Sequence, residues 1–299
     1  MIAARPIDAL RLIDLGHAEG LDGVLVTLVG IEGSSSRAVG TQMAVLADGR
    51  SVGSFSGGCI ERAIIAEALD VLAAGAPRMV RYGIGSPYID VRLPCGGGID
   101  LVFTPRPDAA AIAAVLECHA RREPASIDLG SHRVTYPPAL RLVALGHGED
   151  LVALVRLARG FGADVIGFAP ATDAAPDDAI APIAARTQFP DVATDAWSAI
   201  VFLFHDRDWE EFLLAQALDR PAFFHGAVGS RRTQAARIAH LAARGATAAE
   251  IDRLRATVGL IPATRNPAAL ALSILADVVQ DYEALAQTVV TPIGAPVGA

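Results

Sequence analysis

The sequence predicts an α/β protein with two domains, in which a mixed α/β domain is followed by a domain built on a parallel sheet. A chain of 299 residues is too long for one ordinary core and suits two domains of roughly 100 to 170 residues. A strand–helix–strand order begins at residue 140, which calls for parallel strands. We place the boundary at Pro137 and Pro138, so the domains are expected over 1–138 and 139–299.

In the first domain, hydrophobic periodicity alternates between helical and strand patterns. From Ile60 to Ala74 the apolar residues recur at helical spacing, and Gly75 follows as a helix stop. The Asp48-Gly49 pair predicts a hairpin turn. The expected elements are helices over 6–17, 60–74 and 108–123, strands over 22–30, 78–84 and 99–105, a hairpin over 41–55 and a short hairpin around 130–131.

The second domain reads as continuous apolar strands separated by helices, which is typical of a sheet buried on both faces. Thr247 and Glu250 have the spacing of a capping box, and Asn266-Pro267 marks the start of a long helix. The expected strands cover 140–146, 163–169, 198–206 and 222–230, the expected helices cover 149–162, 209–218, 231–245 and 247–256, and 291–299 is expected to be a loose tail.

The composition excludes several classes of function. The net charge is −8, and arginine does not cluster with aromatic residues, so nucleic acid is not an expected partner. No lysine occurs, which rules out a phosphate-loop lysine and a Schiff base. No apolar run reaches the roughly 18 residues that a membrane span requires. The start of the chain lacks a signal peptide's apolar block, so a cytoplasmic location is expected.

Two of the three cysteines stand next to glycines. Cys59 follows Gly57 and Gly58 and precedes the helix over 60–74, whose positive N-terminal dipole would favour a thiolate. Cys95 stands in "PCGGGID", beside Gly96 and Gly97. Glycines permit tight turns and leave backbone N–H groups open to a ligand, so the two loops suggest one shared pocket. The alternative is that Cys59 is a small buried residue and the glycines only form turns.

Two neighbouring stretches add polar groups to this pocket. Ser34, Ser35, Ser36 and Arg37 lie on a loop between strands, where hydroxyl and guanidinium groups suit an oxyanion such as phosphate, although a solvated loop is equally compatible. Glu61 is either a general base or a carboxylate in the first turn of its helix. No His, Cys or Asp cluster has zinc-ligand spacing, and no G-x-S-x-G motif occurs.

The second domain carries an incomplete dinucleotide-binding pattern. Gly146 and Gly148 occupy the first two glycine positions of the fingerprint, but Leu151 occupies the third. The acidic residue expected at the end of the second strand is replaced by Ala169. Binding of NAD(P) is therefore doubtful, although the fold does not depend on the ligand.

Two further positions in this domain are candidates for ligand contact. His205 stands at the carboxyl end of an expected buried strand, at the edge where open α/β sheets bind ligands. The alternative, which is more common for a single histidine at a strand end, is a local hydrogen bond. Arg231 and Arg232 stand at the start of an expected helix, directly after a glycine turn. These two arginines either bind an anion or are solvated residues at the start of the helix.

Several segments together resemble the XdhC/CoxI family, whose members mature xanthine dehydrogenase and carbon monoxide dehydrogenase by handling the molybdenum cofactor. The matching segments are "GSSSRAVGTQMAVLADGRSVGSFSGGCIERAIIAEALDVL", "PCGGGIDLVFTP", "HDRDWEEFLLAQAL", "VGSRRTQAARIAHL" and "NPAALALSILADV". The resemblance implies that the second domain is Rossmann-like. The sequence departs from the family pattern at "GHGED", at Ala169 and at "VGLIPATRNP".

The resemblance implies a maturation factor rather than an enzyme. Such a protein would bind molybdopterin-type molybdenum cofactor, assist its sulfuration with a cysteine desulfurase-type sulfurtransferase, and deliver it to an apo-molybdoenzyme of the xanthine dehydrogenase family. Our own hypothesis for the roles is that Cys59 and Cys95 meet the molybdenum or its sulfur, while residues 34–37 and the open amides take the phosphate of the cofactor. A homodimer is also expected. The alternatives are an NAD(P)-dependent oxidoreductase, disfavoured by Leu151 and Ala169, and a scaffold that only bridges the partner proteins.

Overall fold

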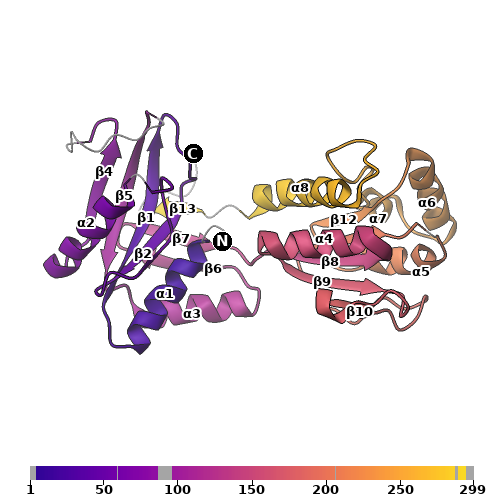
Figure 1. Cartoon of the computed structure of the whole chain (residues 1–299), viewed down its shortest axis with the longest axis horizontal. Coiled ribbons are helices and arrows are strands. Elements are labelled where there is room, and N and C mark those ends of the chain that lie inside the picture. The colour runs from indigo at the N-terminus through magenta and orange to yellow at the C-terminus, as the bar shows by residue number, and fades with distance from the viewer. Residues whose placement is uncertain (1–4, 59, 87–95, 206, 287–288, 294–299) are drawn as a thin grey trace. The chain divides into compact units, whose positions relative to one another are not determined.

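The computed structural model describes residues 5–58, 60–86, 96–205, 207–286 and 289–293, which form two compact units (Figure 1). The first unit contains the elements from α1 to β7 together with β13, and the second contains those from β8 to α8. Each unit is described by itself. Among the described residues, no helix combines the length and apolar character needed to cross a bilayer.

The first unit contains a five-stranded antiparallel sheet of order β3-β2-β1-β5-β4 and a three-stranded sheet of order β13-β7-β6. Its elements are α1 (Pro6–Ala18), β1 (Gly23–Glu32), β2 (Gln42–Leu46), β3 (Ser51–Val52), α2 (Glu61–Ala74), β4 (Arg78–Gly83), β5 (Gly98–Pro105), α3 (Ala109–Ala120), β6 (Ala125–Leu129), β7 (His132–Tyr136) and β13 (Val290–Pro292).

The two faces of the larger sheet are covered by different elements because successive strand residues point to opposite faces. Val24, Val26 and Leu28 of β1 pack with α2 in one apolar cluster. Leu25 packs in a second cluster with α1, α3 and the smaller sheet. Tyr136 of β7 donates a hydrogen bond to Gln42 Oε1 at 2.8 Å, which joins the smaller sheet to β2 inside this second cluster.

The second unit has a parallel sheet of order β10-β9-β8-β11-β12, as expected for a Rossmann-type domain. Its elements are β8 (Arg141–Gly146), α4 (Gly148–Phe161), β9 (Asp164–Ala169), the 3₁₀ helix η1 (Pro176–Asp178), β10 (Ile180–Pro182), β11 (Ser198–Leu203), α5 (Arg207–Leu218), β12 (Phe224–Ala227), α6 (Arg231–Ala243), α7 (Ala248–Asp252) and α8 (Pro267–Leu285). The predicted fold class is confirmed.

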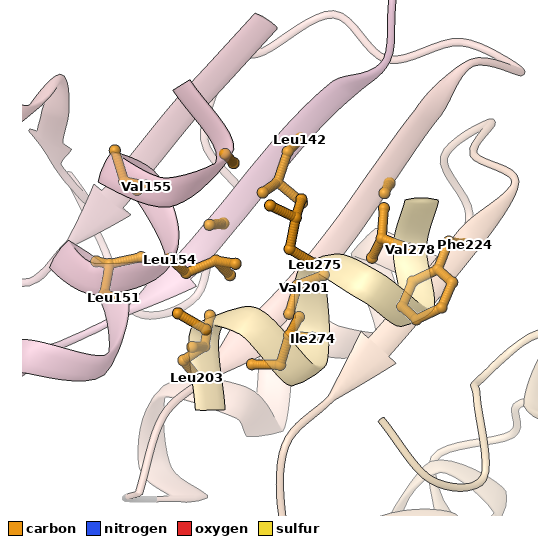
Figure 2. Packing of buried hydrophobic residues seen from close by; sticks show 14 of the residues in the cluster. Leu142, Leu151, Leu154, Val155, Val201, Leu203, Phe224, Ile274, Leu275 and Val278 are labelled. Atoms are coloured by element: carbon orange, nitrogen blue, oxygen red, sulfur yellow. The ribbon is translucent and has the colours of Figure 1, made fainter. Parts of the chain in front are cut away.

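Helices cover both faces of the parallel sheet, which explains why its strands are almost wholly apolar. Figure 2 shows side chains of α4, such as Leu151 and Leu154, and of α8, such as Ile274 and Leu275, packing over the strands. The opposite face is covered by residues of α5 and α6, among them Leu213 and Leu241. The strand order reverses between β8 and β11, so the carboxyl ends of these two strands form the position where open α/β sheets usually bind ligands.

The fold differs from the sequence-based expectation at the end of the second domain and at the end of the strand over 198–206, and it contains the unexpected strand β10. The second domain was expected to run to residue 299, but β13 pairs with β7 in the first unit, and Thr291 and Pro292 therefore belong to a strand rather than to a loose tail. The strand expected over 198–206 ends at Leu203, and α5 begins at Arg207.

Candidate functional site

Three glycine-bearing loops emerge from one end of the five-stranded sheet. One follows β1 (33–37), one lies between β3 and α2 (53–58 and 60), and the third precedes β5 (96–97). The pairing of Glu32 with Gly98 puts the end of β1 beside the start of β5, and the antiparallel order brings the end of β3 to the same edge. Segments far apart in the sequence are therefore neighbours here.

Hydrogen bonds join the first loop to the second. The hydroxyl of Ser36 donates to the carbonyl oxygen of Phe55 at 3.1 Å, and Nε of Arg37 donates to that of Ser54 at 3.2 Å. Because both acceptors are backbone atoms, these contacts fix the path of the chain just before the double glycine.

Close backbone packing joins the first loop to the third. A Cβ atom at Gly97 would overlap the carbonyl oxygen of Ser34, so only glycine fits there. Gly57, Gly58 and Gly96 have φ angles of 74°, 125° and 70°, which side-chain-bearing residues rarely adopt. Apart from the chain neighbours, no atom of the described residues lies within 4 Å of a Cβ placed on them, so the described part of the chain leaves their backbone open.

The Glu61 carboxylate at the start of α2 organises the second loop by accepting five hydrogen bonds from the described residues. Its Oε1 accepts from the hydroxyl of Ser54 at 2.7 Å and from the amides of Phe55 at 3.0 Å and Ser56 at 2.8 Å. Its Oε2 accepts from the Ser56 hydroxyl at 2.8 Å and from the Ile60 amide at 3.2 Å. The donors lie on both sides of the double glycine, so one carboxylate closes the turn.

These hydrogen bonds keep Glu61 ionised. Burial alone would raise its pKa, but the Ser56 amide and the hydroxyls of Ser54 and Ser56 lower the pKa to about 2. A carboxylate with so low a pKa is a weak proton acceptor near neutral pH. Of the two roles that the sequence left open for Glu61, the structure favours the carboxylate of the first helical turn over a general base.

Hydroxyl and guanidinium groups of the first loop are partly occupied by hydrogen bonds within the protein. The hydroxyls of Ser35 and Ser36 donate to the carbonyl oxygens of Arg37 and Phe55, at 2.9 Å and 3.1 Å. Arg37 uses Nε and one Nη1 hydrogen on backbone carbonyls, and its other N–H donors have no partner among the described residues. Ser34 is exposed and has no hydrogen-bond partner among the described residues. Ser34 and Arg37 are therefore the better placed groups for contact with an anion.

An ion-pair cluster that the sequence did not reveal braces the ends of three strands. Arg81 of β4 contacts both carboxylate oxygens of Asp100 on β5 at 3.2 Å, and it also pairs with Glu32 at the end of β1. Its Nε donates to the carbonyl oxygen of Ile84 at 2.8 Å. The only sequence signal was an aspartate inside the otherwise apolar run "IDLVF".

The two predicted metal ligands, Cys59 and Cys95, lie outside the described residues. Their described neighbours Gly58 and Gly96 belong to the second and third loops, respectively. The remaining cysteine, Cys118 of α3, is half-buried, and Nη2 of Arg121 lies 3.4 Å from its sulfur. In the part of the chain that is described, no group of three His, Cys, Asp or Glu residues could hold a metal ion.

The structure places three candidates of the second unit at the carboxyl ends of β8 and β11. Gly146 ends β8, and a Cβ there would lie 2.8 Å from Leu203 Cβ, so this glycine serves strand packing. Gly148 begins α4 with a φ of 69°. His205 Nε2 lies 3.0 Å from Asp150 Oδ2, and its ring centroid lies 5.4 Å from that of His147.

This edge lacks the features that hold a dinucleotide. The first turn of α4 carries Glu149 and Asp150, whose negative charges oppose a pyrophosphate at the helix N-terminus. Leu151 is buried against the sheet, and the end of β9 at Ala169 offers no carboxylate for a ribose. The doubt about NAD(P) binding stays a prediction.

Arg231 is the first residue of α6 and is exposed, with Ser230 as the N-cap. The third arginine of this helix, Arg237, was missed because nothing local in the sequence separates it from solvated arginines. Its guanidinium is buried and forms a two-pronged ion pair with Glu210 of α5, at 2.8 Å and 2.6 Å. It also donates to the carbonyl oxygen of Ala227, which fixes the end of β12 before Arg231.

The fold and the loops define a two-unit protein, with a glycine-rich edge in the first unit and a Rossmann-type second unit without a dinucleotide fingerprint. Residues 17–83 match the XdhC and CoxI family, and residues 142–278 match the XdhC Rossmann domain. The chain is 36% identical over 279 residues to the molybdenum cofactor insertion chaperone PaoD of Escherichia coli K12, covering 87% of this chain and 83% of that protein. The chain belongs to the XdhC and CoxI family.

Two further comparisons are more distant. The chain is 26% identical over 267 residues to the uncharacterised protein YqeB of Escherichia coli K12, of which it covers 43%. A crystal structure described as a xanthine dehydrogenase from Bacillus halodurans superposes with a TM-score of 0.73 at 19% identity, over 95% of this chain and 97% of that chain. The second likeness supports the fold alone.

Proposed function

We propose that this protein is a chaperone that binds the molybdenum cofactor and inserts it into a molybdoenzyme. The observation that carries the proposal is the edge where three loops with open glycine backbone meet, in a chain homologous over most of its length to a molybdenum cofactor insertion chaperone. The homology supports a role in molybdenum cofactor maturation, and the loops offer a place for the cargo.

The residues of this edge suit the chemistry of the cargo. Arg37 and Ser34 offer donors to its phosphate, and the open backbone at Gly57, Gly58 and Gly96 permits close approach of a planar pterin. We assign Cys59 and Cys95 as thiol ligands that meet the molybdenum or its sulfur, because thiolates bind soft metals. Glu61 holds the second loop and does not take up protons.

Sulfuration and delivery of the cofactor would each require a partner protein. Cofactor held at the loops would receive a sulfido ligand in place of an oxo ligand with the help of a cysteine desulfurase-type sulfurtransferase. It would then pass to an apo-enzyme of the xanthine dehydrogenase or carbon monoxide dehydrogenase type, in the cytoplasm. The second unit would contribute Gly148, His205 and Arg231 to the contact with cargo or client.

The test measures the cofactor that the protein retains and delivers. Protein purified from a cofactor-producing host is expected to release a fluorescent oxidised pterin and to activate an apo-molybdoenzyme. A Cys59→Ala, Cys95→Ala double variant should lose both properties, whereas the matched Cys118→Ala variant should keep them. Retention and transfer at the wild-type level by the double variant would refute the assigned thiol roles, and absence of pterin from the wild-type protein would refute the proposed function.

A further inference from the structure

The ion-pair cluster of Arg81 lies at the edge of the sheet from which the three loops emerge. Nη1 of Arg81 donates to both carboxylate oxygens of Asp100 at 3.2 Å, and Nη2 pairs with Glu32. Nε donates to the carbonyl oxygen of Ile84 at 2.8 Å. Asp100 belongs to β5 and Glu32 ends β1, so one side chain of β4 connects three adjacent strands (Figure 1).

Three glycines leave the space that this cluster occupies. A Cβ atom at Gly30 would lie 2.7 Å from Oδ2 of Asp100. One at Gly85 would lie 3.1 Å from Nε of Arg81, and one at Gly98 would lie 3.1 Å from its Nη2. Side chains at these positions would crowd the charged groups, so the surrounding backbone is matched to this arrangement of Arg81.

Backbone contacts link the cluster to the loops of the proposed cofactor site. The carbonyl oxygen of Ile84 accepts from Arg81, and the amide of the same residue donates to the carbonyl oxygen of Gly97 at 3.1 Å. A Cβ atom on Gly97 would overlap the carbonyl oxygen of Ser34, so the third loop touches the first. The cluster is therefore linked through Ile84 and Gly97 to Ser34, which is proposed to contact the phosphate of the cofactor.

The cluster contains one positive group and two negative ones. Glu32 of β1 pairs with Gly98 of β5, so Glu32 and Asp100 stand at the same end of adjacent strands. Without the guanidinium these like charges would repel each other. The side chains of Arg81 and Asp100 are each 28% exposed, whereas that of Glu32 is 65% exposed. The pair with Asp100 is therefore the less screened of the two.

We propose that Arg81 is a positioning residue for cofactor binding, which sets the distance between the first and third loops. By neutralising the two carboxylates, its guanidinium keeps the ends of β1 and β5 together, so that Ser34 and the open backbone of Gly96 can contact one ligand. Arg81 acts through the neighbouring backbone and does not touch the cargo. The inference rests on the proposed function, because it takes these loops as the place where the cofactor binds.

The experiment compares Arg81→Met with Arg78→Met in the full chain. Arg78 lies on the same strand but on its other face, where it pairs with Glu67 of α2, so its replacement makes the same charge change away from the loops. Pterin retained per chain is measured by fluorescence after purification from a cofactor-producing host. It should fall about fivefold or more in Arg81→Met and stay within about twofold of wild type in Arg78→Met.

Hydrogen exchange in the cofactor-free protein tests the loops directly. In protein from a host that does not make the cofactor, the segments 30–36 and 83–86 should exchange about fivefold faster in Arg81→Met than in wild type. Exchange in α6 of the second unit should not change, because that helix makes no contact with the cluster.

A double variant, Arg81→Met with Asp100→Asn, separates charge neutralisation from packing. Removing the Asp100 charge removes the repulsion with Glu32, so the double variant should retain at least about twice as much pterin as Arg81→Met. Recovery stays incomplete because the hydrogen bond to Ile84 is still missing. If Arg81 only filled space, the second substitution would bring no recovery. Should Arg81→Met not fold, Arg81→Gln takes its place with the same expected loss, since its amide keeps a donor for Ile84.

Several results would overturn the inference. One is pterin content and exchange at the wild-type level in Arg81→Met. Others are equal losses in the two single variants, faster exchange without loss of pterin, and no recovery in the double variant. In all of these cases the wild-type protein still carries pterin, so the proposed function stands. Absence of pterin from the wild-type protein refutes the proposed function and this inference with it.

Discussion

Replacing Glu61 by glutamine should destabilise the first unit in a way that depends on pH. Glutamine keeps the shape of the side chain but removes the charge and turns an N–H group toward the donors of Ser54 and Ser56. Wild-type Glu61 has its pKa lowered from 4.5 to about 2, which at about 1.4 kcal/mol per tenfold change corresponds to roughly 3 kcal/mol. Because the residue is only half-buried, solvent screening reduces the expected contribution to about 1–2 kcal/mol.

The sign of the pH dependence follows from the direction of this pKa change. A carboxylate whose pKa is lower in the folded than in the unfolded state stabilises the fold above the unfolded pKa. For Glu61 the contribution is complete above about pH 4.5 and is lost as the pH falls toward 2. The difference in stability between wild type and Glu61→Gln should therefore shrink over this interval.

The assay is hydrogen exchange of the amides of residues 54–60 between pH 3 and 7, corrected for the intrinsic exchange rate. Trp197 and Trp209 lie in the second unit, so tryptophan fluorescence reports on that unit. Asp70→Asn, at an exposed position on the same helix, makes the same charge change and should have little effect. A loss of protection in Glu61→Gln that stays constant across this pH range, or no loss at all, would contradict the account of Glu61.

Two further substitutions have expected outcomes with matched controls. Gly97→Ala should destabilise the first unit by about 3 kcal/mol or more in thermal unfolding, because its Cβ overlaps a backbone oxygen, whereas Gly96→Ala should cost only about 1 kcal/mol for its positive φ. Arg237→Met should cost about 3–5 kcal/mol because it leaves the buried Glu210 carboxylate unpaired, and Arg231→Met should change stability by less than about 0.5 kcal/mol. Equal effects within either pair would contradict these assignments.

The fold was predictable where local patterns decide it. The continuous apolar runs at 140–146 and 198–203 are strands of a sheet buried on both faces, and such runs are visible in the sequence. The short strands β10 and β13 were not expected because three residues carry too little periodicity. The return of β13 to the first unit depends on a pairing over more than 150 residues, for which the sequence has no local signal.

The candidate site was predictable in its composition but not in its connections. The glycines and serines stood out as motifs. The ion pairs between Arg81 and Asp100 and between Glu210 and Arg237 did not, because each joins residues that are far apart in the sequence. A charged residue inside an apolar pattern shows that a partner exists, but only the fold shows which one. This limit also explains why the role of Glu61 could not be decided before its hydrogen-bond donors among the described residues were known.

The internal hydrogen bonds of the loops decide which groups remain for a ligand. Ser35, Ser36 and Glu61 direct their polar atoms at other loop atoms, so they hold the loops in place without cargo. A loop already fixed in this way loses little conformational entropy when a ligand binds. In the proposed cofactor site, recognition would therefore be left to the open glycine backbone, to Ser34 and to the remaining donors of Arg37. Substitutions at Ser36 should alter the loop itself before they alter any contact with the proposed cargo.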